Sequence, residues 1–210
     1  MRIYTRRGDS GTTSLRTGAR VPKDSLAVEV NGAVDEAQAA LGLARSECPP
    51  GGELDRTIQG VQRDLWILMS EVATEPGREG DLDPGRTAVT DAMVAALESR
   101  IDAVVATVEL EREFSVPGAG RCSAALDLAR TIVRRAERLA VSLAREGGLP
   151  EGSRVGPYLN RLSDLCWALA RSAESERQLA VDVPSDAREK DVATRPGETP
   201  GRDEQERAER

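Results

Sequence analysis

Residues 124–138 read AALDLARTIVRRAER, and this stretch decides the fold because it carries an apolar period and a charged period at once. The apolar side chains recur at steps of three and four residues, which is the spacing of one face of an α-helix. They are Leu126, Ala129, Val133, Ala136 and Ala140. The pattern predicts one helix that buries this face in a core.

The charged side chains of the same stretch fall on a different face of that helix. They are Asp127, Arg130, Arg134, Glu137 and Arg138. Arginine presents a fixed fork of donors that suits carboxylates and phosphates, and it keeps its charge at all physiological pH values. The row is typical of an anion-binding surface, but it also fits a solvated helix face held together by its own ion pairs.

The composition narrows the function classes. The chain has 210 residues, enough for one domain with a proper core. Its 29 Lys and Arg against 36 Asp and Glu give a net charge of −7, which argues against a general nucleic-acid binder. Aromatic residues make up 2% of the chain, so the core must come from aliphatic residues, and helices are favoured. The chain has no histidine, which removes the commonest general base and most zinc sites.

The cysteines and the hydropathy of the sequence predict the cellular compartment of the protein. Cys48, Cys122 and Cys166 are far apart in sequence and form no C-x-x-C motif, which indicates a reducing compartment. The first residues, MRIYTRRGDSG, lack the apolar segment of a signal peptide, and no run of residues is long and apolar enough to span a membrane. We therefore expect a soluble, cytoplasmic protein with no membrane partner.

Turn residues divide the chain into an expected all-α architecture. Helices are predicted over about 23–45, 53–73, 87–109, 124–138 and 158–175, separated by Gly- and Pro-rich breaks. Five such helices with modest loops predict an antiparallel bundle, ferritin-like in appearance. The expected organisation is an N-terminal loop at 1–22, the bundle at 23–178 and a disordered charged tail at 179–210.

The N-terminal segment TRRGDSGTTS, residues 5–14, combines glycines, hydroxyls and arginines. Glycines let backbone N–H groups approach an anion, and hydroxyls and guanidinium groups donate to phosphate oxygens. The segment is not a Walker A loop, because the G-x-x-x-x-G-K-[ST] pattern is absent. Its residues alone favour a flexible arm slightly over a phosphate loop.

Six blocks of the sequence, in order, carry a resemblance. They are IYTRRGDSGTTSL (3–15), RVPKDS (20–25), NGAVDEAQAALGLA (31–44), FSVPGAG (114–120), ALDLARTIVRRAER (125–138) and YLNRLSDLCWALAR (158–171). The chain resembles the PduO-type ATP:cob(I)alamin adenosyltransferases over about residues 3–172. The resemblance implies a homotrimer in which ATP and the corrinoid (cobalamin) meet at subunit interfaces. It also implies transfer of the 5′-deoxyadenosyl group of ATP to Co(I), with magnesium present and triphosphate released.

The resemblance assigns the nucleotide half of the site by position. Thr5, Arg6, Gly8, Thr13 and Ser14 match the family's ATP loop, in which Arg7 stands where threonine is usual. Lys23 matches a phosphate-contacting lysine, and Asn160 matches an asparagine that contacts the nucleotide. The family's RRxER block corresponds to Arg134, Arg135, Glu137 and Arg138, with Arg134 expected to hold the triphosphate.

The corrinoid half is assigned in the same way. Asp35 and Arg130 match a carboxylate–arginine pair across the subunit interface, and Phe114 matches the aromatic that closes the lower face of the corrin. From the residues alone, Phe114 also fits a core position and Asp35 with Arg130 a structural ion pair. Asn160, with Arg161 and Asp164, also fits helix capping and surface roles.

Three further positions depart from the family pattern. Ala119 replaces a glycine, and it would be strained if that position required a positive φ. Asp127 replaces a histidine, and we expect it to pair with Arg130 along the helix and weaken the Asp35–Arg130 contact. Trp167 replaces a phenylalanine.

Two other functions remain open at this point. A catalytically impaired relative could serve as a nucleotide or corrinoid carrier or sensor. A plain helical interaction module would need no Gly/Thr loop. An active enzyme would also imply a reductase that supplies the electron to cobalt and a cobalamin-dependent client enzyme.

Overall fold

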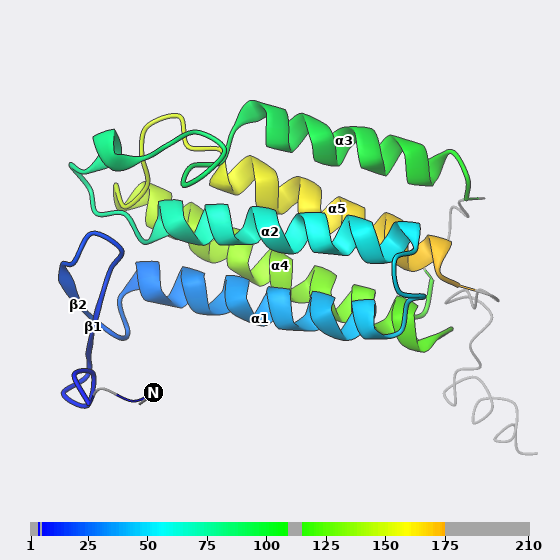
Figure 1. The fold of residues 1–210 in the computed structure, drawn as a ribbon, viewed down its shortest axis with the longest axis horizontal. Helices are drawn as coiled ribbons and strands as arrows, with labels where there is room; N and C mark the ends of the chain where they lie inside the picture. Colours follow the sequence, from blue (N-terminus) through cyan, green and yellow to red (C-terminus); the bar gives the residue numbers. More distant parts are fainter. Residues whose placement is uncertain (1–3, 5, 109–114, 175–210) are drawn as a thin grey trace, which may run out of the picture.

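The computed structural model describes residue 4 and residues 6–108 and 115–174. Thr5 and Phe114 lie outside the described residues, as does the tail predicted from residue 179. The described chain forms five α-helices that pack as a bundle, with a two-stranded hairpin at one end (Figure 1). The elements are β1 (Thr12–Ser14), β2 (Arg20–Pro22), α1 (Leu26–Ser46), α2 (Glu53–Val72), α3 (Asp91–Val105), α4 (Arg121–Arg145) and α5 (Val155–Ser172).

The predicted apolar face of α4 is buried as expected. Leu126, Ala129, Val133 and Ala136 are fully buried, and Ala140 is 1% exposed. The helix extends beyond the predicted stretch at both ends, from Arg121 to Arg145. It packs against α1 on one side and α5 on the other, so it is the central helix of the bundle (Figure 1).

The contact between α1 and α4 is a seam of small side chains. Two ion pairs, Arg135–Glu36 and Arg121–Glu47, show that the two helices run antiparallel. This register places three buried alanines of α1 level with three of α4. The alanines are Ala33, Ala40 and Ala44 of α1 and Ala136, Ala129 and Ala125 of α4. Small residues at facing positions let two helices approach closely.

The turn between α1 and α2 is closed by a single carboxylate. Asp55 accepts a hydrogen bond from Arg45 Nε at 2.5 Å and from the Gly51 N–H at 2.7 Å. These donors hold the pKa of Asp55 at about 2, well below its usual value, because they stabilise the charged form. The side chain therefore satisfies a backbone donor just before α2 begins and ties the end of α1 to it.

Helix α3 is shorter than the predicted 87–109 segment and packs on the outside of α5 (Figure 1). It begins at Asp91, because the Thr90 hydroxyl accepts a hydrogen bond from the Met93 N–H and caps the helix. The preceding residue, Val89, donates its N–H to the carboxylate of Glu71. Residues 87–90 are thus held in a turn and a cap rather than in a first helical turn.

The predicted loop at 1–22 contains a hairpin that the sequence reading missed. Strands β1 and β2 pair antiparallel, with Thr13 opposite Val21 and Ser14 opposite Arg20. The turn between them is anchored on the end of α2, where Arg16 Nε donates to the Thr74 hydroxyl at 3.1 Å. Hydrogen bonds from Thr17 and the Ala19 N–H lower the pKa of the Glu75 carboxyl, which accepts both.

None of the helices in the described part of the chain combines the length and the apolar character needed to cross a membrane.

Enlarging one alanine of the seam tests its packing. Ala129→Leu should lower the free energy of unfolding by about 2 kcal/mol, because the added atoms must force α1 and α4 apart. Ala144→Leu, at an exposed position of the same helix, should change it by less than about 0.5 kcal/mol. Urea unfolding measures both. Equal losses in the two variants would contradict a tight seam.

Candidate functional site

The C-terminal half of α4 carries an open arginine groove. Arg134 and Arg138 are exposed, and with Arg145, Glu137, Val141 and Ser142 they line a hollow of about 400 Å³. Arg138 Nη1 donates to the Arg134 carbonyl at 3.0 Å, which holds it along the helix. Within the described residues, the Arg134 guanidinium has neither an ion-pair partner nor a hydrogen-bond partner. This groove can therefore bind an anion without first breaking a contact of Arg134.

Arg135, the neighbouring arginine of the RRxER block, points elsewhere. Its guanidinium pairs with the carboxylate of Glu36 on α1. The structure thus brings Arg134, Glu137 and Arg138 to one groove and directs Arg135 to the contact between α1 and α4.

Glu137 links the groove to α5. Asn160 Nδ2 donates to Glu137 Oε1 at 3.0 Å, and Asn160 Oδ1 accepts from Arg161 Nη1 at 2.8 Å. Arg161 in turn pairs with Glu98 of α3 at 2.9 Å. Asn160 is therefore held in one orientation beside the groove, and the same contacts tie α3, α4 and α5 together. This geometry is compatible with both roles of Asn160, contact with the nucleotide and a structural role at the helix surface.

The N-terminal loop and Lys23 pack together through a glycine. A Cβ placed on Gly8 would lie 3.1 Å from Lys23 Nζ, so a larger residue here would push the lysine away. The Lys23 N–H also donates to the Gly11 carbonyl at 2.9 Å. Arg6 has a φ of 61°, an unusual backbone conformation for a residue other than glycine. These contacts hold Lys23 against the loop.

Arg20 organises this loop, and the sequence reading did not single it out. Its guanidinium donates to the Arg7 carbonyl at 2.8 Å, the Thr12 carbonyl at 3.2 Å and the Ser14 hydroxyl at 3.2 Å. One feature of the sequence could have identified Arg20: it begins the RVPKDS block, three residues before Lys23. Thr13 and Ser14 lie in β1, so the loop is bounded by a paired strand.

The hairpin and the arginine groove lie at the same end of the bundle (Figure 1). The hairpin leads directly into the start of α1, and the C-terminal half of α4 lies alongside the N-terminal half of α1. The described nucleotide residues of the N-terminal segment and of α4 therefore share one end of the fold.

Asp127 is buried rather than on the charged face where the sequence reading placed it. It is 4% exposed, and its Oδ2 accepts from Arg171 Nη2 of α5 at 2.5 Å. Arg171 is also buried, and its guanidinium lies 5.9 Å from the centre of the Trp167 ring. A carboxylate can be buried at this depth because a cation is buried beside it. The sequence reading missed Arg171.

Asp127 also holds Arg130, as the sequence predicted. Arg130 Nε donates to Asp127 Oδ1 at 3.2 Å. Asp35, the proposed partner of Arg130, is exposed on α1 and has no hydrogen bond or ion pair with the described part of the chain. Within one copy of the chain, the two residues assigned to the corrinoid are therefore not paired with each other.

The loop before α4 adopts the turn without straining Ala119. Gly118 takes the positive φ, at 123°, and Ala119 has no positive φ. The strain considered for Ala119 is therefore absent. Phe114, the aromatic assigned to the corrin, lies outside the described residues.

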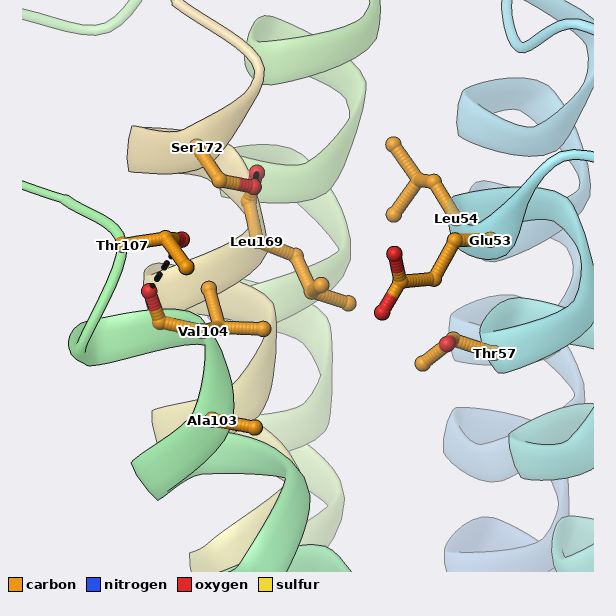
Figure 2. Close-up of a pocket in the computed structure, with 8 residues that line it drawn as sticks. All are labelled: Glu53, Leu54, Thr57, Ala103, Val104, Thr107, Leu169 and Ser172. Atoms are coloured by element: carbon orange, nitrogen blue, oxygen red, sulfur yellow. Dashed lines mark hydrogen bonds between the residues drawn. The ribbon is translucent and has the colours of Figure 1, made fainter.

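A second hollow opens at the other end of the bundle, between α2, α3 and α5, with a volume of about 280 Å³. Figure 2 shows Glu53 and Leu54 of α2 facing Leu169 and Ser172 of α5 across it. None of the residues predicted for the site lines this cleft.

Removing the charge of Asp127 tests the buried pair. Asp127→Asn should lower the free energy of unfolding by about 3 kcal/mol, because Arg171 would remain buried with less compensation. Asp83→Asn removes the partner of Arg86 in an exposed pair and should cost less than about 1 kcal/mol. Thermal or urea unfolding compares them, and similar losses would show that the burial of Asp127 has no special energetic role.

Comparison with known proteins identifies corrinoid adenosyltransferases as relatives of this chain. A corrinoid adenosyltransferase of Bacillus subtilis is 39% identical over 174 residues, which cover 81% of this chain and 86% of that protein. The corrinoid adenosyltransferase PduO of Salmonella typhimurium is 41% identical over 183 residues, 86% of this chain. The match spans about half (52%) of the Salmonella protein.

Solved structures show the same fold. A variant of the PduO-type ATP:corrinoid adenosyltransferase of Lactobacillus reuteri, complexed with cobalamin and ATP, superposes with a TM-score of 0.76 at 30% identity. The match covers 85% of this chain and 96% of that one. A second variant of that enzyme, complexed with ATP, gives a TM-score of 0.74. Residues 3–173 match the family model for cobalamin adenosyltransferase, and the chain belongs to this family.

Proposed function

We propose that this chain transfers the 5′-deoxyadenosyl group of ATP to the Co(I) ion of a corrinoid and releases triphosphate. Membership of the cobalamin adenosyltransferase family supports this reaction. The observation that carries the proposal is the arginine groove of α4, open at Arg134 and placed at the same end as the glycine-rich loop.

The chemistry suits the residues of the chain. Co(I) is itself a strong nucleophile, so its attack on the 5′ carbon of ATP needs no protein nucleophile and no general base. A chain without histidine can therefore catalyse it. The protein contributes orientation of the two substrates and stabilisation of the negative charge that grows on the leaving triphosphate.

We assign the triphosphate to Arg134 and Arg138, with Lys23 approaching from the N-terminal loop. Arg134 is the strongest candidate because its fork of donors has no partner within the described chain. Glu137 and Asn160 form the bonded pair at the edge of the groove and are assigned to the rest of the nucleotide. Arg135 supports the groove from the α1 side through Glu36.

The N-terminal loop is assigned to the phosphates as well. Its backbone is held by Arg20 and by the contact between Gly8 and Lys23, so its N–H and hydroxyl donors are arranged before ATP arrives. The residues assigned to ATP in this loop are Thr5, Arg6, Arg7, Gly8, Thr13 and Ser14.

We propose that the complete site forms between copies of the chain in a homotrimer. Leu43 on α1 and Leu128 on α4 are 52% and 50% exposed, and the register of the two helices puts them at the same level. Large exposed apolar side chains on neighbouring helices are typical of an interface. Asp35 is exposed and unpaired within the described chain, so it is available to meet Arg130 of another copy.

The corrinoid half is assigned to Asp35, Arg130 and Phe114. By covering the lower face of the corrin, Phe114 would exclude an axial ligand and make Co(II) four-coordinate and easier to reduce. A reductase must then supply the electron, and a cobalamin-dependent enzyme would use the product. The free thiols of the described chain fit a reducing compartment, and we propose the cytoplasm.

Within the described residues no cluster of three or more His, Cys, Asp or Glu side chains could hold a metal ion. Phosphate oxygens are the usual partners of magnesium, so we propose that it enters with ATP.

One observation favours a second function, that of a nucleotide or corrinoid carrier. Arg130 is already engaged by the buried Asp127, which competes with its pairing to Asp35. If that competition prevents productive binding of the corrinoid, the chain would bind ATP without turning it over.

An anaerobic assay with ATP, magnesium and chemically reduced cob(I)alamin separates the two functions. Wild type should form adenosylcobalamin, followed by its visible spectrum, and Arg134→Ala should lower kcat by about 100-fold or more, because it removes a donor from the leaving group. Arg121→Ala, on the same helix but paired with Glu47 at its other end, should retain activity. ATP binding by wild type without any product would favour the carrier.

The trimer has its own test. Sedimentation equilibrium should give three times the 22.5 kDa chain mass, and Leu128→Glu should shift it toward the monomer by burying a charge at the interface. Trp66→Glu, at an exposed position of α2, should stay trimeric. A monomeric wild type would contradict the proposed interface.

A further inference from the structure

The fold brings two cysteines together that lie 74 positions apart in sequence. Cys48 follows the end of α1 and Cys122 lies in the first turn of α4, and their sulfur atoms are 3.6 Å apart. Both sulfurs also lie near the Ala44 carbonyl oxygen, at 3.3 Å from Cys48 and 3.6 Å from Cys122. The spacing of the cysteines in the sequence gave no sign of this pair.

The backbone around the two sulfurs is held in register. Residues next to them, Glu47 and Arg121, form an ion pair at 2.9 Å. A disulfide has an S–S length of about 2.05 Å, so the two sulfurs would have to approach by about 1.5 Å. We expect rotation of the two side chains to supply a movement of this size.

We propose that Cys48 and Cys122 form a reversible disulfide within one chain when the protein meets hydrogen peroxide. Cys122 is the more exposed of the two and Cys48 is 9% exposed, so Cys122 meets the oxidant first and Cys48 completes the bond. The pair is a redox-modification site that is separate from the arginine groove, because it lies at the opposite end of α4.

The reaction balances in two steps. The Cys122 sulfur, as the thiolate, attacks one peroxide oxygen; the S–O bond forms, the O–O bond breaks, and the other oxygen leaves as water with the thiol proton. The Cys48 sulfur then attacks the resulting sulfenic acid; the S–S bond forms, the S–O bond breaks, and a second water leaves. The two thiols lose two electrons and two protons in all, and the peroxide is reduced.

The surroundings of the two cysteines affect the rate at which they are oxidised. Burial and the neighbouring Cys48 raise the pKa of the Cys122 thiol to about 12, so little thiolate is present at neutral pH. We therefore expect oxidation of the pair to be slow at neutral pH and faster as the pH rises. Cys166 is a built-in reference, because its thiol is fully buried and has no other cysteine beside it in the described chain.

The test uses the full chain, reduced and then incubated with hydrogen peroxide. Free thiols are blocked with iodoacetamide after denaturation, and the protein is analysed by intact mass and by peptide mapping without reductant. The crosslink should remove 2 Da from the wild-type chain, which should also carry one carbamidomethyl group, on Cys166. The peptide map should contain one pair of peptides joined through Cys48 and Cys122. Dithiothreitol should restore three free thiols.

Single substitutions and stability complete the test. Cys48→Ser and Cys122→Ser should each abolish the crosslink, whereas Cys166→Ala should keep it. The crosslinked chain should unfold at a midpoint about 5 °C higher than the reduced chain, because the bond closes a long loop in the unfolded state. If a variant does not fold, the peptide map of the oxidised wild-type chain alone tests whether Cys48 and Cys122 are joined.

Three results would overturn the proposal. One is that Cys48 and Cys122 both stay free under conditions that oxidise dithiothreitol completely. Another is that Cys122 proceeds to sulfinic acid without joining Cys48, and the third is that the crosslink joins two chains. None of these outcomes bears on adenosyl transfer, so the two proposals stand or fall separately.

Discussion

The close approach of α1 and α4 is the constraint on which the other features of the molecule depend. Two facing rows of alanines give the contact little side-chain volume, so the helices can pack closely only in a register that brings small residues level. That register fixes the Arg135–Glu36 and Arg121–Glu47 pairs at two levels of the bundle. It also brings Cys48 to Cys122 and aligns the exposed Leu43 with Leu128.

The contact between α4 and α5 depends on a buried ion pair rather than on small side chains. Asp127 and Arg171 join α4 to α5 as a buried ion pair, an arrangement that contributes little net stability but is costly to break on one side. The pair also restrains Arg130 through Asp127. A residue assigned to the corrinoid is thus positioned by the packing of the core, so changes at Asp127 or Arg171 affect stability and the position of Arg130 together.

Sequence reasoning succeeded where local pattern decides the structure and failed where a distant partner decides it. The apolar period of residues 124–138 was enough to predict the buried face of α4, and the turn residues were enough to separate five helices. Asp127 was misplaced because an aspartate three residues before an arginine has the pattern of an exposed pair, while its second partner, Arg171, is 44 positions away. The hairpin was missed because its anchor is Thr74, far along the chain. The residue assignments for the substrates come from the resemblance, because exposure alone does not identify a ligand.

The placement of the arginine groove resolves an apparent conflict between a net charge of −7 and an anionic substrate. Arg145 lies in the last turn of α4, where the helix dipole leaves partial negative charge and favours a cation. The helix terminus therefore favours Arg145, whereas Arg134 and Arg138 lie outside the turn in which this effect acts. The positive charge is local, and at physiological ionic strength its field is screened over about 8 Å. An acidic protein can thus present a cationic groove to a triphosphate placed within it, without attracting nucleic acids at long range.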